Sequence, residues 1–215
     1  IAFLGGRGSG KTLGIRDILK SIDHHGMPYM SIFSKTEGAT GFFKEIYDDV
    51  YISTEPDEDR LGEIIQRGKD FKSIINLSRK YAMELFEKNA SETEKDELHE
   101  AKRVYDKNQE EKIILEFLSI QWLSLNNNDK IKLVPYIYAD PRALIVYDDC
   151  LCDKNAFKNP AIKEIFMNGR HYFITFILSL QSPKGIENEL RDNVDYLFIY
   201  GSADIKKTHE AFLQS

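Results

Sequence analysis

The residues best suited to chemistry form a glycine-rich turn near the start of the printed sequence. Residues 5–12 read Gly-Gly-Arg-Gly-Ser-Gly-Lys-Thr, which matches the pattern G-x-x-x-x-G-K-[ST]. A loop that wraps a polyanion in backbone N–H groups needs glycine, because it adopts dihedral angles that side chains disfavour. The pattern therefore predicts a phosphate-binding P-loop. Its expected contact residues are Gly5, Gly6, Arg7, Gly8, Ser9, Gly10, Lys11, Thr12 and Leu13.

The last two polar side chains of this loop have separate predicted roles. Lys11 would place a positive charge on the β and γ phosphates, and the Thr12 hydroxyl would be a ligand of Mg²⁺. Apolar residues at helical spacing follow the loop and predict a helix whose N-terminus points at the same phosphates. ATP and Mg²⁺ are thus the expected cofactors. The alternative is a plain glycine turn between a strand and a helix.

A pair of carboxylates follows the apolar run 143–147. Asp148 occupies the place where a P-loop NTPase needs its Walker B carboxylate, which orients Mg²⁺ together with Thr12. Asp149 could orient the attacking water or accept its proton, which makes it the predicted catalytic carboxylate. The alternative for this pair is a helix-capping aspartate in a loop.

Two further polar residues flank the apolar run 172–180. Gln181 follows it, where a neutral amide could contact both the lytic water and the γ-phosphate; the alternative is a turn residue. Arg170 precedes it, on the opposite edge of the expected sheet from the nucleotide. From there it could serve a neighbouring subunit of a ring as an arginine finger in trans, with an ion pair at a helix end as the alternative. Arg142 and Arg191 are rivals for this role.

The elements that position these side chains alternate between apolar runs and helical patterns. This alternation predicts an α/β fold with a mostly parallel central sheet flanked by helices, in which ligands sit at the carboxyl ends of the strands. A charge-dense stretch of about 58–130 has helical spacing and predicts a helical insertion. Residues 130–139 contain Pro135 and predict an edge strand. The core strands are expected at 1–4, 29–33, 143–147, 172–180 and 196–200, with a helix around 156–168.

The composition limits which partners, cysteine chemistry and cellular location we expect. The net charge of −6 argues against a protein that coats nucleic acid, although a local basic surface remains compatible with it. Cys150 and Cys152 support neither a disulfide framework nor a zinc site, so we expect reduced cysteines, with a redox role as the alternative. No apolar run has the roughly 20 residues of a membrane span, which predicts a soluble, intracellular protein. The start inside an apolar run, without Met, suggests a fragment of a longer chain.

Three segments together resemble a known family. They are the loop 5–12, residues 144–150 (Leu-Ile-Val-Tyr-Asp-Asp-Cys), and residues 168–172 (Asn-Gly-Arg-His-Tyr) leading to Gln181. The set is similar to the genome-packaging ATPases of large double-stranded DNA viruses, the poxvirus type, in the FtsK/HerA superfamily of P-loop NTPases. The likeness covers the expected α/β core, about two-thirds of the chain. The second Walker B acid of that superfamily is often Glu, whereas this sequence has Asp149.

The resemblance implies a RecA/FtsK-like P-loop ATPase domain spanning residues 1–215. It also implies a homo-oligomeric ring that threads double-stranded DNA into a capsid, with capsid proteins as further partners. The expected location is the host cytoplasm at sites of virus assembly, and the virion. Two other functions use the same loop: a small-molecule (nucleoside or nucleotide) kinase, which would need an arginine-rich lid and an acceptor pocket, and a nucleotide-dependent assembly switch. Lys11, Asp149, Gln181 and Arg170 are the predicted catalytic residues of the ATPase.

Overall fold

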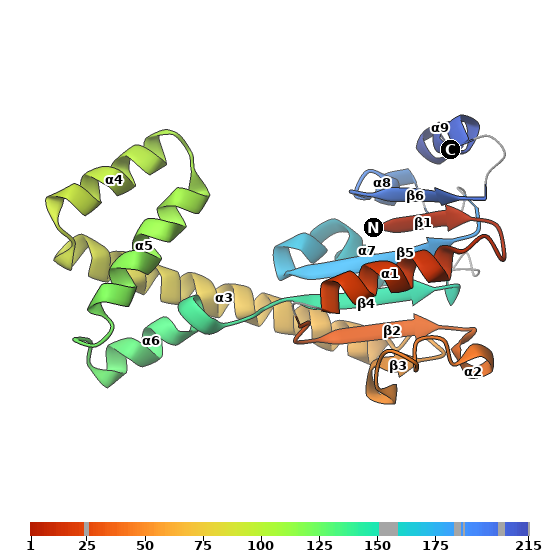
Figure 1. Cartoon of the computed structure of the whole chain (residues 1–215), viewed down its shortest axis with the longest axis horizontal. Helices are drawn as coiled ribbons and strands as arrows, with labels where there is room; N and C mark the ends of the chain where they lie inside the picture. The colour runs from red at the N-terminus through yellow and green to blue at the C-terminus, as the bar shows by residue number, and fades with distance from the viewer. Residues whose placement is uncertain (24–25, 151–158, 183–185, 187, 202–204, 215) are drawn as a thin grey trace. The chain divides into compact units, whose positions relative to one another are not determined.

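The computed structural model describes residues 1–23, 26–150, 159–182, 186, 188–201 and 205–214. The chain divides into two compact units, one made of Ile1–Lys69 with Pro141–Ser215 and the other of Asp70–Asp140. The long helix α3 (Glu58–Asn89) begins in the first unit and ends in the second (Figure 1). The predicted insertion of 58–130 therefore begins twelve residues before the second unit and ends ten residues before its last residue, Asp140.

The first unit is built on a six-stranded sheet in the order β3-β2-β4-β5-β1-β6, and every pairing in it is parallel. This arrangement confirms the predicted α/β class and parallel sheet. Each predicted core strand has an observed counterpart that differs by at most two residues at either end. The strands are β1 (Ala2–Gly5), β2 (Met30–Ser34), β3 (Ile52–Ser53), β4 (Ala143–Asp148), β5 (Ile174–Leu180) and β6 (Leu197–Tyr200).

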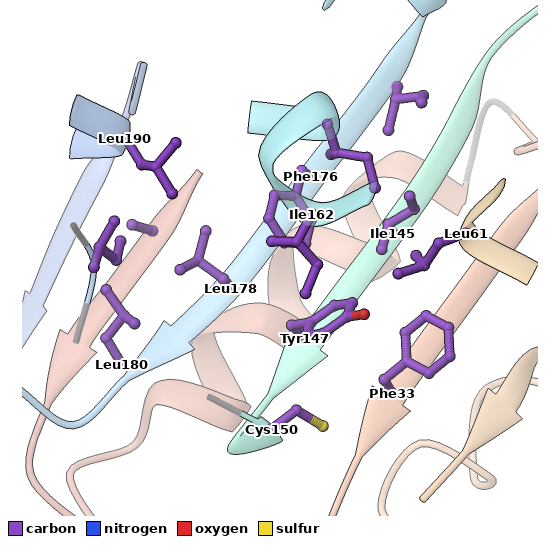
Figure 2. Packing of buried hydrophobic residues seen from close by; sticks show 14 of the residues in the cluster. Phe33, Leu61, Ile145, Tyr147, Cys150, Ile162, Phe176, Leu178, Leu180 and Leu190 are labelled. Carbon is purple, nitrogen blue, oxygen red and sulfur yellow. The ribbon is translucent and has the colours of Figure 1, made fainter. Parts of the chain in front are cut away.

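Both faces of the sheet are covered, which is why its central strands are apolar runs rather than alternating patterns. All six residues of β4 are buried. Along this strand Val146 packs with Ile15 and Leu19 of α1 (Lys11–Asp23), whereas Tyr147 belongs to the cluster on the other face. Figure 2 shows this second cluster around Tyr147, whose ring lies 5.0 Å from that of Phe33.

The second face is covered by the first part of α3, which contributes Leu61, and by short helices that follow the strands. These helices are α7 (Pro160–Asn168), α8 (Asn188–Arg191) and α9 (Ile205–Gln214), and they contribute Ile162, Leu190 and Phe212 to the cluster, the first two of which Figure 2 labels. Asn159 caps α7 by accepting from the backbone N–H of Ala161 at 2.8 Å, and Pro160 occupies a first-turn position where its missing N–H costs nothing. The first part of the predicted 156–168 helix, like Cys152, lies outside the described residues.

Short elements complete the connections of the first unit. The helix α2 (Glu37–Thr40) and the 3₁₀ turn η1 (Asp49–Tyr51) lie between β2 and β3. A second 3₁₀ turn, η4 (Gly169–Tyr172), joins α7 to β5. Of these, η4 matters most for the functional analysis, because it places Arg170 at the amino end of β5.

The second unit has its own helical core. Its helices are the later part of α3, α4 (Glu92–Arg103), α5 (Lys107–Gln121) and α6 (Asn127–Tyr138). The rings of Phe86 and Phe117 meet edge to face at 5.0 Å in this core. Helix starts are marked in the sequence: Ser91 and Glu94 form a reciprocal capping box at the start of α4.

The predicted edge strand at 130–139 is wrong, because α6 occupies these residues with Pro135 inside the helix. A proline there opens the hydrogen-bond ladder of the helix. Ser78 of α3 fills the gap: its hydroxyl donates to the carbonyl of Lys132 at 2.5 Å and accepts from the N–H of Tyr136 at 3.1 Å. The helix survives its proline because a residue more than fifty positions away bridges the interrupted step.

Candidate functional site

The glycine loop, residues 5–12, connects β1 to α1 in a conformation that requires glycine. Gly8 and Gly10 have φ angles of 73° and 96°, in the left-handed region that other residues rarely adopt. A Cβ on Gly5 would lie 2.5 Å from the carbonyl oxygen of Tyr200 and 2.7 Å from Ser9 Oγ. The loop is therefore held tightly against the end of β6, and the space at Gly5 is too small for any side chain.

Lys11 begins α1, and its side chain curls back into this loop. It is only 6% exposed, and its ammonium donates to the carbonyl oxygens of Gly5 and Gly6, both at 2.9 Å. An ammonium carries three donors, so one stays available for a further acceptor. Ser9 Oγ is also buried and has no hydrogen-bond partner among the described residues. The loop thus contains a buried ammonium with a donor to spare and a buried hydroxyl that no described residue bonds, and both groups suit an anionic ligand.

The two predicted metal ligands meet although they are 136 residues apart in sequence. Thr12 Oγ1 donates to Asp148 Oδ2 at 3.1 Å. Asp148 is fully buried, and Ser179 on the neighbouring strand β5 donates to its Oδ1 at 2.7 Å. Burial raises the pKa of Asp148 above its ordinary value; the charge of Asp149 acts in the same direction, and hydrogen bonds from Ser179 and Thr12 oppose it.

Two of the predicted catalytic residues, Asp149 and Gln181, also contact each other. Asp149 has φ 52°, a left-handed conformation that aspartate tolerates better than most residues. Its backbone N–H donates to Ser179 Oγ at 2.9 Å, and its Oδ1 accepts from Gln181 Nε2 at 3.2 Å. This turn points the Asp149 carboxylate towards the strand end that carries Gln181.

Sheet order explains why these groups converge. Because β5 lies between β1 and β4, the carboxyl ends of these three strands are adjacent and their arrows point the same way in Figure 1. The glycine loop follows β1, Asp148 ends β4 with Asp149 directly after it, and Gln181 follows β5. The carboxyl edge of a parallel sheet is the usual ligand site of such folds.

Arg170 does not join this group. It lies at the opposite end of β5, whose seven residues span roughly 23 Å at about 3.3 Å per residue. Its Nη2 is 3.1 Å from Asp195 Oδ1, and its side chain is 61% exposed. Of its rivals, Arg191 is buried against the carbonyls of Ile186 and Phe212. Arg142 donates to the carbonyl of Gly26 at 3.0 Å.

Sequence reasoning missed two residues that shape the site. Ser179 bonds the Asp148 carboxylate and the backbone N–H of Asp149, and its signal was a hydroxyl residue near the carboxyl end of the mostly apolar strand β5. Tyr200 packs against the loop and α1: a Cβ on Gly14 would collide with its hydroxyl and lie 2.9 Å from its Cζ. Gly14 lies outside the eight-residue loop pattern, so only the fold shows why glycine stands there.

A divalent cation is compatible with this donor set. Mg²⁺ prefers oxygen ligands and keeps several waters, so it commonly uses one or two protein oxygens together with substrate phosphates. Thr12 Oγ1 and Asp148 supply two such oxygens. The described residues contain no group of three or more His, Cys, Asp or Glu side chains arranged for a metal ion.

Sequence comparison finds similarity to uncharacterized proteins of large viruses. It is 26% identical over 200 residues to an uncharacterized protein of Acanthamoeba polyphaga mimivirus, covering 93% of this chain and 51% of that protein. It is 26% identical over 203 residues to an uncharacterized protein of Invertebrate iridescent virus 6, covering 93% and 53%. An uncharacterized protein of African swine fever virus is 28% identical over 158 residues, covering 67% and 44%.

The chain spans about half the length of the curated relatives it matches. No protein-family profile matches the chain. No solved structure matches it either. Within the described part of the chain, no helix has the length and apolar character that crossing a membrane would require.

Proposed function

We propose that this chain is the ATP-hydrolysing domain of a motor that moves double-stranded DNA and packages a viral genome into a capsid. The observation that carries the ATPase part is the contact between Thr12 Oγ1 and Asp148 Oδ2 beside the buried ammonium of Lys11. A glycine loop, a lysine, a hydroxyl and a strand-end carboxylate are the parts with which P-loop NTPases hold Mg²⁺ and ATP. The fold proposed for the first unit is accordingly of the RecA/FtsK-like P-loop type.

The chemical step needs positioned charges rather than a covalent intermediate. The loop and Lys11 would hold the β and γ phosphates, and Mg²⁺, when bound to Thr12 and Asp148, would neutralise phosphate charge. Asp149 would orient a water for attack on the γ-phosphorus and take up its proton while the bond to the β–γ bridging oxygen breaks. Gln181, bonded to Asp149 at 3.2 Å, would fix the position of that carboxylate and of the water.

The DNA-packaging part rests on the sequence resemblance and on the viral origin of the relatives. In a homo-oligomeric ring, an exposed Arg170 at the far end of β5 would serve the site of a neighbouring subunit. The overall charge of −6 means that DNA would be gripped by local groups of lysine or arginine on pore-facing loops. Capsid proteins would be further partners. The protein would be located at the site of virus assembly.

Steady-state phosphate release, measured with and without duplex DNA, tests this proposal. We expect turnover that duplex DNA raises, that Lys11→Ala abolishes together with tight nucleotide binding, and that Asp149→Asn abolishes while binding persists. Lys20→Ala, on the exposed far end of the same helix, is the matched control and should turn over normally.

Three results would contradict the proposal. Phosphoryl transfer to a nucleoside acceptor in place of water would make the protein a kinase. Nucleotide binding without turnover in the wild type would make it an assembly switch. Turnover at the wild-type rate in Asp149→Asn would show that Asp149 is not the catalytic carboxylate.

A further inference from the structure

A pocket of about 360 Å³ opens beside the glycine loop, towards β6 and α9. Its lining includes Gly5 and Gly6, whose carbonyls hold the Lys11 ammonium, and Gln181 at the end of β5. Lys207 of α9 lines the same pocket and is the charged side chain among its described lining residues. The pocket therefore connects the start of the glycine loop and Gln181 to a cation that lies in none of the motifs.

The helix that carries Lys207 is anchored on both sides of this pocket. The helix packs on β6, and β6 in turn lies against the loop, since a Cβ on Gly5 would lie 2.5 Å from the carbonyl oxygen of Tyr200. Near the end of α9, Phe212 is 2% exposed in the main core, and Arg191 donates to its carbonyl at 2.8 Å. Lys207 thus belongs to a helix that packs on the core and on the strand beside the loop.

A further cation would suit the charge of the proposed site. Asp148, Asp149 and a triphosphate would supply negative charge there, and Lys11 and Arg7 of the loop and the bound Mg²⁺ would supply positive charge. Arg170 lies at the other end of β5 and cannot help in its own subunit. Charge that develops on phosphate oxygens during hydrolysis is stabilised most by cations already positioned around them.

Building on the proposed ATPase activity, we propose that Lys207 contacts the γ-phosphate end of ATP bound in its own subunit. It is then a catalytic residue acting in cis, distinct from any arginine that a neighbouring subunit supplies. The contact depends on the γ-phosphate, so it favours ATP over ADP. This preference separates a phosphate contact from a merely structural role.

The test compares Lys207→Ala with Lys206→Ala, its neighbour on the exposed surface of α9, which does not line the pocket. Competition against a fluorescent nucleotide gives the affinities for ADP and for a non-hydrolysable ATP analogue. We expect Lys207→Ala to bind the ATP analogue about 10-fold more weakly, with ADP affinity unchanged, because a charge-assisted contact is lost. Its kcat should fall roughly 10- to 100-fold, and Lys207→Arg should recover most of it. Lys206→Ala should match the wild type.

Unchanged ATP-analogue affinity and kcat in Lys207→Ala would overturn the inference, and so would equal losses in the two alanine variants. A parallel fall in ADP and ATP-analogue affinity would also overturn it, because it would reveal a structural role. If Lys11→Ala abolishes turnover while Lys207→Ala does not, the proposed ATPase stands and only the Lys207 contact fails. If the wild type shows no Lys11-dependent turnover, both fail.

Discussion

Replacing Ser179 with alanine should damage the site more than any comparable small change in the sheet. Ser179 is 2% exposed, and its hydroxyl donates to Asp148 Oδ1 at 2.7 Å and accepts from the backbone N–H of Asp149 at 2.9 Å. The substitution would leave a buried carboxylate with one hydrogen bond fewer and a part-buried N–H without its partner. It would also raise the pKa of Asp148 further, since the Ser179 bond favours the charged form.

The magnitude follows from the two bonds. A hydrogen bond to a charged group is worth about 1.5–3 kcal/mol, and a neutral one about 1 kcal/mol. We therefore expect the free energy of unfolding to fall by about 2.5–4 kcal/mol in Ser179→Ala.

Ser31→Ala is the matched control, because Ser31 on β2 is also fully buried but its hydroxyl has no hydrogen-bond partner among the described residues. Removing an unpaired hydroxyl should change the unfolding free energy by less than about 0.5 kcal/mol or raise it. Urea unfolding at pH 7, followed by circular dichroism, measures both variants. Equal losses in the two variants would refute the view that the Ser179 hydroxyl stabilises the fold through its bonds to the Asp148 carboxylate and the Asp149 backbone N–H.

Three further predictions concern packing and pH. Gly14→Ala should lower the unfolding temperature although alanine favours helices, because its Cβ would meet the Tyr200 ring. In a Tyr200→Ala background, thermal unfolding should show a smaller fall in that temperature. An equal fall would show that the Tyr200 ring does not cause the destabilisation. Ser78→Ala should cost roughly 2 kcal/mol in urea unfolding, because the gap that Pro135 opens in α6 loses its bridge; wild-type stability would contradict the bridge. The hydrogen bond from Tyr172 lowers the pKa of Glu164 below 4.5, so this bond stabilises the fold above that pH and the benefit fades as pH falls through the lowered pKa. Tyr172→Phe should accordingly be less stable than the wild type near neutral pH and approach it in acid, when unfolding is measured across pH 3–7. A difference in stability that does not change with pH would show that ionised Glu164 is not the partner through which Tyr172 stabilises the fold.

The sheet could be predicted because strands buried on both faces are apolar runs that end in polar residues. The meeting of Thr12 and Asp148 follows from the same rule, since parallel strands bring their carboxyl ends to one edge. The sequence alone could not show which strand separates β1 from β4. That order decides that Ser179 and Gln181, both at the carboxyl end of β5, lie beside the carboxylates.

The failures come from interactions between distant segments. Pro135 argued against a helix, and the hydrogen bonds that rescue α6 come from Ser78 on another helix. Lys207 lies in no motif and enters the pocket only because β6 and α9 pack beside the loop. Local propensity carries no signal for either contact, since both depend on tertiary packing.

The most direct test of the central claim is an experimental structure of the protein with Mg²⁺ and a non-hydrolysable ATP analogue. We predict phosphates enclosed by the glycine loop and Lys11, the metal ion coordinated by the Thr12 hydroxyl with Asp148 in its immediate surroundings, and the γ-phosphate next to Gln181. A nucleotide bound elsewhere, or phosphates in the loop with Asp148 and Gln181 turned away from them, would contradict the proposed ATPase.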